Sequence, residues 1–328
     1  MRAIVIKKHG DIRVLSHTNI QKPKIIPGHV IIKVKYCALN HLDLKVRKGL
    51  CGTKIKFPHI LGSDICGNLE NGFDKFNVGD EVVIYPIIND ENSISKLNMI
   101  GGCSNYNGGY AEFVLVPKQC IIKKPKWLSS IESCSLNVSY LTVWNILRTF
   151  DCKKDDEIFV WGGNSGIGTA SILLAKSIGC KVITTVSDDS KIGLVKKLGA
   201  DVVLNRKKKN ILRSVMRGTN GVDHVIDHVG SKTWQTSINM LKAGGKMATC
   251  GVTTGNYSKV NIFDVYNKQI KIFGIYMGNK SQLIELHKFM KLKKIKPIID
   301  SILSLRDARL AHKKLENGKQ FGKIVLRV

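Results

Sequence analysis

Residues 157–170, EIFVWGGNSGIGTA, constrain the fold more than any other stretch of this chain. An apolar run from Ile158 to Trp161 predicts a buried strand, and the apolar-periodic segment that ends at Gly179 predicts a helix. A glycine turn between them lets a pyrophosphate approach the backbone and rest against the positive end of the helix. The sequence therefore predicts a nicotinamide dinucleotide site at this turn, formed by Gly163, Ser165, Gly166, Ile167 and Gly168.

Strands and helices continue to alternate after this turn. Helices of about 10–14 residues between successive strands imply right-handed crossovers and a doubly wound parallel sheet, the Rossmann fold. We expect strands at 158–161, 181–186, 201–204, 223–227, 246–250 and 270–274, with helices at 166–179, 188–198, 208–217 and 231–242. A further helix is expected before them, from Ser130 to Arg148.

The first part of the chain has a different pattern. Short alternating segments such as Val30 to Tyr36 and Gly109 to Pro117 are separated by turns. They predict a β-rich, partly antiparallel, barrel-like domain. The final segment, Lys323 to Val328, predicts a strand that fits either the Rossmann sheet or the first domain.

The chain is strongly basic, with 52 Lys and Arg against 25 Asp and Glu and a net charge of +27. Such a field attracts anions in general, including nucleotides, acyl-CoA, nucleic acid and anionic membrane surfaces. The lysines are spread along the whole chain, which favours solvated surface lysine over a dedicated polyanion site. Aromatic residues do not alternate with the basic clusters, so nucleic-acid binding is not the favoured function.

The cysteines and the apolar runs indicate a compartment. Nine cysteines without a CxxC pair are not typical of a disulfide framework, so we expect most of them to be small buried residues under reducing conditions. No apolar run reaches the ~20 residues that span a bilayer, and the N-terminus lacks a signal-peptide pattern. A cytoplasmic protein without membrane contact is expected.

Several strings resemble those of the medium-chain dehydrogenase/reductase superfamily, and within it of quinone-oxidoreductase-like proteins. They are ALNHLD (38–43), PHILGSD (58–64), GGYAEF (108–113), the glycine turn, IDHVG (226–230), GVTTG (251–255) and GKQFGKIVL (318–326). The resemblance covers nearly the whole chain. It implies a GroES-like catalytic domain at 1–125, completed by 293–328, and a Rossmann domain at 126–292. It also implies that His228, Cys250 and Val252 contribute to the dinucleotide site.

Zinc-dependent relatives hold a catalytic metal with a cysteine, a histidine and a third cysteine or acidic ligand. The matching positions here are Asn40, Ser63 and the vicinity of Val138, none of which is a good zinc ligand. The family's structural zinc lobe, with four cysteines, would lie around residues 88–105, where only Cys103 occurs. We therefore expect no zinc, and the less favoured alternative is a site rebuilt from His41, His59, Cys37 or Asp64.

The residue after the second Rossmann strand helps to select the nucleotide, because an acidic side chain there binds the ribose hydroxyls of NAD. Ser187 stands at this position and leaves room for a 2′-phosphate. Lys191 and Arg206 match positions where NADPH-using relatives place phosphate-binding groups. Lys191 could equally be a solvated helix lysine, and Asp188 and Asp189 would repel a phosphate if they pointed inward. NADPH is favoured over NADH.

Without zinc, no Lewis acid polarises an alcohol oxygen, so alcohol oxidation is disfavoured. Zinc-free relatives pass hydride to a quinone or an α,β-unsaturated carbonyl, while the protein supplies position and hydrogen bonds to the developing oxyanion. The resemblance suggests Asn40 as such a donor, Ser63 as a cleft residue and Thr142 beside the nicotinamide. Each could instead be structural, in a turn or a buried helix. Lys45 stands where relatives often carry an aromatic residue, and it would suit an anionic acceptor such as an acyl-CoA thioester.

The sequence thus predicts a zinc-free, NADPH-dependent quinone or enone/enoyl reductase that acts on a small-molecule electron acceptor. The resemblance further implies a homodimer paired along Lys268 to Tyr276. Two alternatives remain open: a metal-dependent alcohol dehydrogenase with an altered site, and a nucleic-acid-binding protein on the same fold.

Overall fold

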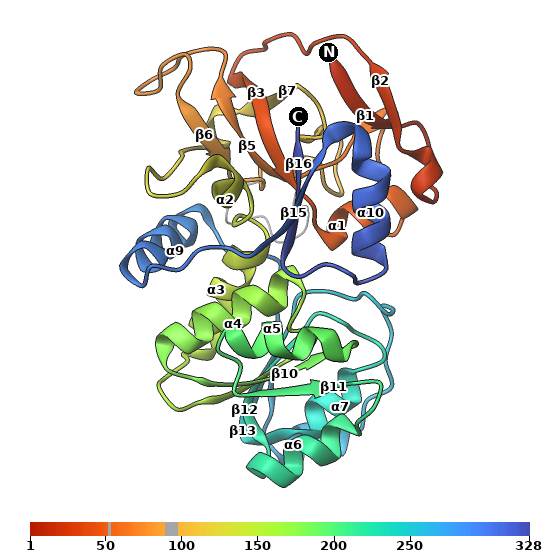
Figure 1. The fold of residues 1–328 in the computed structure, drawn as a ribbon, viewed down its shortest axis with the longest axis vertical. Coiled ribbons are helices and arrows are strands. Elements are labelled where there is room, and N and C mark those ends of the chain that lie inside the picture. The colour runs from red at the N-terminus through yellow and green to blue at the C-terminus, as the bar shows by residue number, and fades with distance from the viewer. Residues whose placement is uncertain (52–53, 89–97) are drawn as a thin grey trace. The chain divides into compact units, whose positions relative to one another are not determined.

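The computed structural model of the protein describes residues 1–51, 54–88 and 98–328. The chain forms two compact units, a first unit of Met1–Val138 with Ile299–Val328 and a second unit of Ser139–Ile298 (Figure 1). Both borders fall later than the expected ones after residues 125 and 292. The physical reason is that helix α2 (Ser130–Cys134) packs on strand β5 (Asp64–Leu69) of the first unit, and that the returning strand β15 begins only at Ile299.

The first unit is built on β-sheets, as the alternating segments predict. Its larger sheet has the order β15-β16-β3-β5-β6-β8, with β7 also paired to β3, and a smaller sheet has the order β2-β1-β4. The strands are β1 Arg2–Ile6, β2 Ser16–Asn19, β3 His29–Ala38, β4 His59–Ile60, β5 Asp64–Leu69, β6 Glu81–Ile84, β7 Phe113–Pro117, β8 Ile121–Lys123, β15 Ile299–Ser304 and β16 Lys323–Arg327. Helices α1 (His41–Lys48), α2 and α10 (Ala308–Glu316) accompany them.

Strand β3 organises the first unit. Its β-branched residues Val30, Ile32 and Val34 are buried, as is typical of a central strand. Strand β16 lies antiparallel to β3, with Val325 opposite Ala38, and parallel to β15. The final segment therefore returns to the first unit, which confirms the expectation drawn from the family resemblance.

The second unit is a doubly wound parallel sheet with the order β11-β10-β9-β12-β13-β14, so the Rossmann prediction is confirmed. Helices α4 and α5 cover one face of the sheet, and α6 and α7 cover the other (Figure 1). The strands are β9 Glu157–Val160, β10 Lys181–Val186, β11 Val202–Asn205, β12 Val222–Asp227, β13 Leu241–Thr249 and β14 Lys271–Gly274. The helices are α3 Ser139–Phe150, α4 Gly166–Ile178, α5 Ile192–Lys197, α6 Ile211–Thr219, α7 Trp234–Asn239, α8 Ile262–Asn267 and α9 Lys280–Leu292.

Capping residues explain where the helices differ from the sequence expectation. The helix expected from Ser130 to Arg148 is interrupted between Cys134 and Ser139, and its first part starts at a capping box formed by Ser129 and Glu132. Helix α6 begins later than expected, because the Asn210 side chain accepts a hydrogen bond from the Arg213 amide at 3.0 Å.

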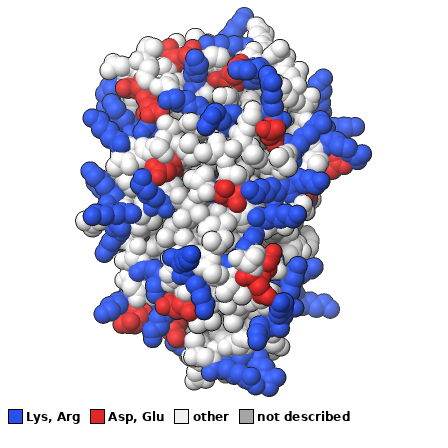
Figure 2. All heavy atoms as spheres, in the orientation of Figure 1, with Lys and Arg blue, Asp and Glu red and all other residues white. Residues whose placement is uncertain are grey.

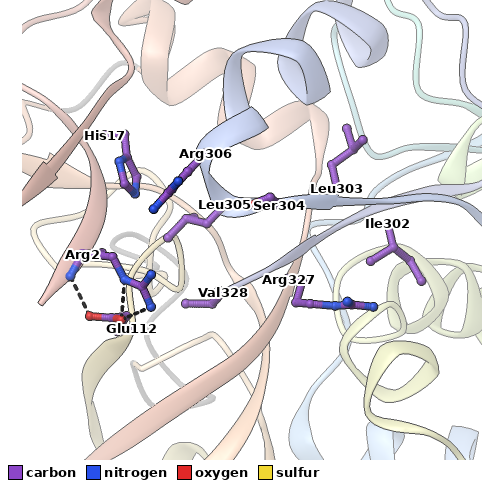
Figure 3. Close-up of a pocket in the computed structure, with 10 residues that line it drawn as sticks. All are labelled: Arg2, His17, Glu112, Ile302, Leu303, Ser304, Leu305, Arg306, Arg327 and Val328. Carbon is purple, nitrogen blue, oxygen red and sulfur yellow. Dashed lines mark hydrogen bonds and ion pairs between the residues drawn. The ribbon is translucent and has the colours of Figure 1, made fainter.

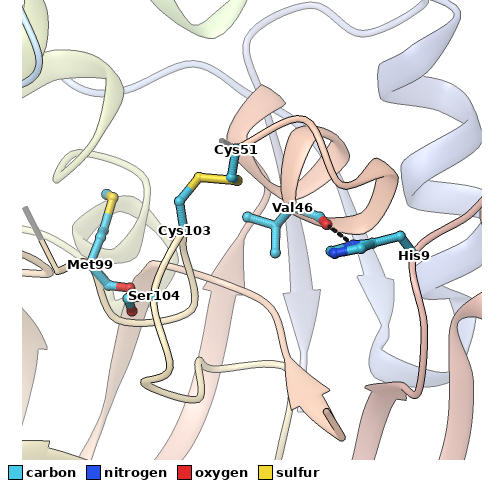
Figure 4. The surroundings of a disulfide bond; sticks show 6 residues. All are labelled: His9, Val46, Cys51, Met99, Cys103 and Ser104. Atoms are coloured by element: carbon cyan, nitrogen blue, oxygen red, sulfur yellow. Dashed lines mark hydrogen bonds between the residues drawn. A yellow bond between two sulfur atoms is a disulfide. The ribbon is translucent and has the colours of Figure 1, made fainter. Parts of the chain in front are cut away.

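One cysteine pair differs from the expectation. Cys51, just after helix α1, forms a disulfide with Cys103, in the loop that also carries Ser104 (Figure 4). Their Cα atoms are 5.6 Å apart. Because the two residues are 52 positions apart in the sequence, their spacing does not predict the pair. The other seven cysteines are free, and five of them are buried, in line with the remainder of the prediction.

Basic side chains are scattered over the face shown in Figure 2, with acidic side chains between them. This distribution is the one expected for solvated lysines. Among the residues that the structure describes, no helix is long and apolar enough to cross a membrane.

Candidate functional site

The glycine turn of the second unit links β9 to α4 with very little space. A Cβ at Gly168 would lie 2.2 Å from the Gly162 carbonyl oxygen, and a Cβ at Gly163 would lie 2.6 Å from Thr184 Oγ1. Gly162 adopts a φ of +65°, which favours glycine. The turn therefore requires glycine at all three positions.

The N-terminus of α4 supplies hydrogen-bond donors at this turn. The Ser165 hydroxyl caps the helix by accepting from the Gly168 amide at 2.9 Å. The amides of Gly166 and Ile167 belong to the first turn, where no intrahelical acceptor is available. An α-helix N-terminus with such amides binds phosphate well, so these residues fit the pyrophosphate of a nicotinamide dinucleotide.

Loops from two further strands lie at the same edge of the sheet. His228 follows β12, and its Nε2 lies 2.7 Å from the Trp161 carbonyl oxygen and 3.4 Å from Ser165 Oγ. Burial lowers the pKa of His228, which favours a neutral ring that bridges the two loops. The loop after β13 packs against it, since a Cβ at Gly251 would lie 2.8 Å from the His228 carbonyl oxygen. Cys250 and Val252 flank that glycine, so of the three implied residues His228 contacts the predicted turn and the other two lie beside the His228 loop.

The end of β10 carries the residues expected to select the nucleotide. Ser187 follows the strand directly, and Arg206 is adjacent because its amide donates to the Val186 carbonyl at 2.9 Å. Arg206 is exposed at the surface. Lys191 lies in a short 3-10 helix, Asp189–Lys191, after Ser187. Its capping residue Asp188 binds the amide and hydroxyl of Ser190 at 3.0 and 2.9 Å.

Asp189, the second acidic residue near this position, is also engaged. It accepts a hydrogen bond from Asn205 Nδ2 at 2.6 Å and forms an ion pair with Lys208. The hydrogen bonds from Asn205 and Lys208 lower the pKa of Asp189. Both carboxylates therefore have protein partners, and whether they would repel a bound phosphate stays untested.

Thr142 lies in helix α3 of the second unit, where it is 3% exposed. This position agrees with the structural alternative for Thr142, a threonine that is simply buried in a helix. Its role beside the nicotinamide stays a prediction.

The most unusual group in the first unit is a buried cluster around Lys323. Its Nζ donates to Asn40 Oδ1 at 2.6 Å, to Asp64 Oδ2 at 2.9 Å and to the Leu39 carbonyl at 2.8 Å. Asn40 Nδ2 in turn donates to Asp64 Oδ2 at 2.8 Å. The Lys323 and Asp64 side chains are 2% and 0% exposed. A lysine ammonium thus joins the start of α1 to the start of β5.

Asp43 binds backbone amides next to the Lys323 cluster. It accepts from the Asn40 amide at 2.7 Å and from the Gly62 amide at 3.1 Å. The first bond is half of a capping box for α1, which explains the Asn-x-x-Asp spacing. Burial raises the pKa of Asp43 to about 7, against the opposing effect of the Asn40 hydrogen bond.

These residues do not fit a catalytic zinc. Asn40, Ser63 and Val138 offer an amide, a hydroxyl and an aliphatic side chain where zinc requires thiolate, imidazole or carboxylate. The nearby carboxylate of Asp64 is saturated, because its second oxygen accepts the Val138 amide at 2.9 Å. Ser63 Oγ is buried without a hydrogen-bond partner among the described residues.

The alternative ligands for a rebuilt site do not come together either. Within the described residues, the group of metal-binding side chains that the structure gathers lies elsewhere, in the second unit. Cys37 is buried, and burial raises the pKa of its thiol well above the usual range. Burial also lowers the pKa of His59 to about 4. The family's structural zinc lobe lies partly at 89–97, outside the described residues, and Cys103 is used in the disulfide.

The first unit also carries two lysines to consider, Lys45 on α1 and Lys323 at the start of β16. Lys45 lies half-buried on α1, one turn after His41. Lys323 was not anticipated as a site residue, although a signal exists. It precedes the apolar run Ile324–Leu326 in a strand, where a lysine is buried only if it has partners.

A separate hollow lies at the other end of β16. It has a volume of about 310 Å³ and is lined mainly by residues of β15 and β16 and by the Arg2–Glu112 ion pair (Figure 3). It is formed near Arg327, the last residue of the strand that Lys323 begins. It is therefore not part of the Lys323 cluster.

Two family models match the chain. Residues 26–126 match the alcohol dehydrogenase GroES-like domain, and residues 166–291 match the zinc-binding dehydrogenase domain. These ranges fall in the first and second units respectively.

Individual relatives match over the whole length. An NAD-dependent alcohol dehydrogenase from Sulfolobus acidocaldarius is 30% identical, with 100% of each chain covered. The quinone oxidoreductase of Mus musculus is 28% identical over 99% of this chain and 97% of its own. Among solved structures, an NAD-dependent alcohol dehydrogenase superposes with a TM-score of 0.92 at 32% identity and full coverage of both chains. A mycobacterial protein complexed with NADPH has a TM-score of 0.85 at 27% identity, again with both chains fully covered.

The similarity extends over both units. It covers relatives described as alcohol dehydrogenases and others described as quinone oxidoreductases. The fold, the two domain matches and the full-length relatives agree. The chain belongs to the medium-chain dehydrogenase/reductase superfamily and is an oxidoreductase of that family.

Proposed function

We propose that this protein is an NADPH-dependent reductase that transfers hydride to a quinone or an α,β-unsaturated carbonyl without a catalytic zinc. One observation carries the proposal. Asn40 and Ser63 stand at positions that match zinc ligands. The Lys323 ammonium donates hydrogen bonds to Asn40 and to the neighbouring carboxylate of Asp64. A buried cation with three protein acceptors stabilises this corner without any metal.

The nicotinamide nucleotide fits the second unit and supplies hydride when bound. The α4 amides and the Ser165 cap would bind the pyrophosphate. Ser187, Lys191 and Arg206 favour NADPH, because no acidic side chain follows β10 directly and both nearby aspartates bind protein groups. The NADPH-bound relative is consistent with this preference, whereas the NAD-dependent relatives make NADH the alternative.

Asn40 is the proposed hydrogen-bond donor to the developing oxyanion. Its amide is fixed at both ends, with Oδ1 accepting from Lys323 and Nδ2 donating to Asp64. An orientation fixed in this way lowers the reorganisation needed when charge develops on the substrate. Ser63 is proposed to contact the acceptor, since its Oγ lacks a protein partner among the described residues, and Thr142 keeps its proposed role beside the nicotinamide.

The test is oxidation of NADPH, and then of NADH, with a small set of quinones, enones and an enoyl-CoA in the presence of a chelator. We expect NADPH consumption with at least one acceptor. If the protein binds NADPH but turns over none of them, the reductase proposal fails. Activity only on alcohols, and only after metal is restored, would favour a metal-dependent alcohol dehydrogenase instead.

Lys45 supports a narrower proposal about the acceptor. Its half-buried position on α1 places a cation on the helix that Asn40 begins. An acyl-CoA thioester would benefit from this charge and from the basic surface. Lys45→Ala should lower activity on enoyl-CoA but not on simple enones, and equal losses would argue against an acyl-CoA substrate.

We also propose that the protein is a homodimer paired along β14. This strand is an edge of the six-stranded sheet. Ile272 on the strand and Tyr276 just after it are 39% and 46% exposed, which is typical of a surface that pairs with another chain. Light scattering should give twice the chain mass, and Ile272→Lys should shift it towards the monomer. A monomeric wild-type protein would exclude this pairing.

The high net charge keeps nucleic-acid binding as a weaker alternative. The basic residues on the face in Figure 2 are dispersed rather than gathered into one stripe. Binding to a DNA duplex that persists at low salt and falls steeply with salt would favour it.

A further inference from the structure

Three side chains with metal-binding chemistry gather at the amino-terminal edge of the second unit's sheet, and Cys180 lies beside them. Cys152 follows helix α3, Asp156 directly precedes β9, and His224 is the third residue of β12. Cys180 directly precedes β10. The glycine turn lies at the opposite, carboxyl-terminal end of β9, so this group is separate from the proposed nucleotide site.

The sheet register explains why residues so far apart in sequence meet. His224 is paired with Ile158 of β9, two residues after Asp156. The Lys181 amide donates to the Asp156 carbonyl at 2.9 Å, which places Cys180 beside the same strand end. The ring of Phe150 stacks on His224 with centroids 4.8 Å apart and fixes the plane of the imidazole.

The distances suit a tetrahedral ion. One ligand atom each from Cys152, Asp156 and His224 lie within 4.8 Å of one another. The His224 Nε2 and Asp156 Oδ2 atoms are 3.2 Å apart. In a tetrahedral zinc site, a nitrogen and an oxygen ligand are about 3.4 Å apart. The His224 and Asp156 atoms are therefore already close to the separation that an ion requires. An ion would hold the cysteine sulfur about 3.6 Å from either of these atoms, a separation inside the 4.8 Å within which the three now lie.

Cys180 provides the fourth position. Its thiol lies 3.3 Å from the Lys153 carbonyl oxygen, outside the group of three ligand atoms that are within 4.8 Å of one another. If the Cys180 side chain turns toward these three, two sulfurs, one imidazole and one carboxylate make a closed set of four ligands, which is typical of structural rather than catalytic zinc. His224 is only 6% exposed, and its Nδ1 has no hydrogen-bond partner among the described residues. Its other nitrogen, Nε2, faces Asp156 Oδ2 and is the atom that would bind the ion.

The charge around the group also suits a divalent cation. Two thiolates, one carboxylate and Zn²⁺ together carry a net charge of −1. Lys246 lies opposite His224 on the neighbouring strand β13, and its ammonium donates to the Phe150 carbonyl. One lysine therefore balances the charge of the loaded site. Buried ionic groups require such compensation.

We propose that Cys152, Asp156, His224 and Cys180 bind one Zn²⁺ ion, which ties helix α3 to the starts of β9, β10 and β12. The ion is structural and has no part in hydride transfer. It would stabilise the second unit, because a metal that binds only the folded chain adds its binding free energy to folding.

The experiment uses the full-length protein, stripped with a chelator and titrated with Co²⁺. We expect one equivalent to produce the thiolate-to-cobalt charge-transfer band and the visible bands of tetrahedral cobalt, and added Zn²⁺ to remove them. Zinc should also raise the thermal unfolding temperature of the stripped protein.

Variants locate the site. Cys152→Ser and His224→Asn should each abolish the cobalt bands, whereas the matched controls Cys120→Ser, which removes a buried cysteine of the first unit that is not in the disulfide, and His17→Asn should retain them. NADPH binding reports whether each variant is folded, since the nucleotide turn lies at the other end of the sheet. Absence of the bands in wild-type protein, or their persistence in folded Cys152→Ser or His224→Asn, would overturn the proposal. Neither result depends on the acceptor or on turnover.

Discussion

The Nζ of Lys323 lies 2.9 Å from Asp64 Oδ2 in an ion pair that solvent does not reach. The pair connects β16, at the end of the chain, with β5 in its first part. A charge buried in this way is stable only with its partner, because desolvation of a lone ion is costly.

Lys323→Met should therefore destabilise the protein by about 3–5 kcal/mol, since it leaves the Asp64 carboxylate buried without its cation. Combining it with Asp64→Asn should cost less than the sum of the two single changes. Urea unfolding measures both effects. The control is Lys35→Met, which removes the half-exposed lysine paired with Glu81 at 2.9 Å and should cost at most about 1 kcal/mol. Equal losses in Lys323→Met and Lys35→Met would contradict the buried pair.

Gly168→Ala should strongly weaken NADPH binding, because its Cβ would lie 2.2 Å from the Gly162 carbonyl oxygen and force the turn open. The control is Gly218→Ala near the end of α6, where a Cβ meets nothing within 4 Å. Titration of nucleotide fluorescence gives both affinities. Tight NADPH binding by a folded Gly168→Ala protein would place the nucleotide elsewhere.

Arg206→Ala should raise the Kd for NADPH by about 10- to 100-fold and leave the Kd for NADH unchanged, since one charge-assisted contact to the 2′-phosphate is lost. Ser187→Asp should also raise the Kd for NADPH, and it should lower the Kd for NADH. Lys197→Ala, which removes an exposed lysine of α5, is the matched control. A parallel loss of affinity for both nucleotides would show that Arg206 does not read the phosphate.

Asp43 should make stability depend on pH. Burial raises its pKa to about 7 in the folded protein, whereas an aspartate in the unfolded chain titrates near 3.9. Between about pH 4 and 7 the folded protein therefore holds a proton that the unfolded chain releases, and this contribution to stability falls as the pH rises. The stability advantage of the wild type over Asp43→Asn should shrink from pH 4 to pH 7.5 in urea unfolding. An advantage that grows over this range would indicate that Asp43 is ionised when folded.

The disulfide can be tested by counting the thiols that react with a reagent. In denaturant without reductant, seven of the nine cysteines should react with a thiol reagent, and all nine should react after reduction. Cys51→Ser should lower stability by about 2–4 kcal/mol under non-reducing conditions, because the bond closes a long loop. The same variant should match the wild type in reductant. Nine reactive thiols in freshly purified, unreduced protein would show that the bond does not form.

Local patterns were sufficient to predict most of the second unit. Strand β10 was expected at its observed residues, 181–186, because its β-branched run is bounded by Gly179 and Ser187. The glycine turn was predictable because its spacing follows from steric requirements within a few residues. Helix α6 was misjudged by three residues, since a capping asparagine outweighs the helical propensity of the preceding lysines.

The corner around Asn40 was only partly predictable. The sequence shows that zinc ligands are missing, but it does not show that Lys323 comes to within 2.6 Å of Asn40 Oδ1. That contact depends on the pairing of β16 with β3, which joins residues almost 290 positions apart. The Cys51–Cys103 bond and the Cys152–His224 group escaped prediction for the same reason. Long-range pairing, rather than local pattern, creates these sites.

The return of β16 to the first unit has a consequence for how the protein is made. On the ribosome, residues 139–298 emerge as one uninterrupted segment, whereas the first sheet lacks β15 and β16 until residues 299–327 have been made. Until then Asp64 has no cation and β3 has an open edge beside Ala38. The earliest-synthesised part of the chain is thus the last to be completed, and nascent chains halted before residue 323 should depend on chaperones that shield an unpaired strand.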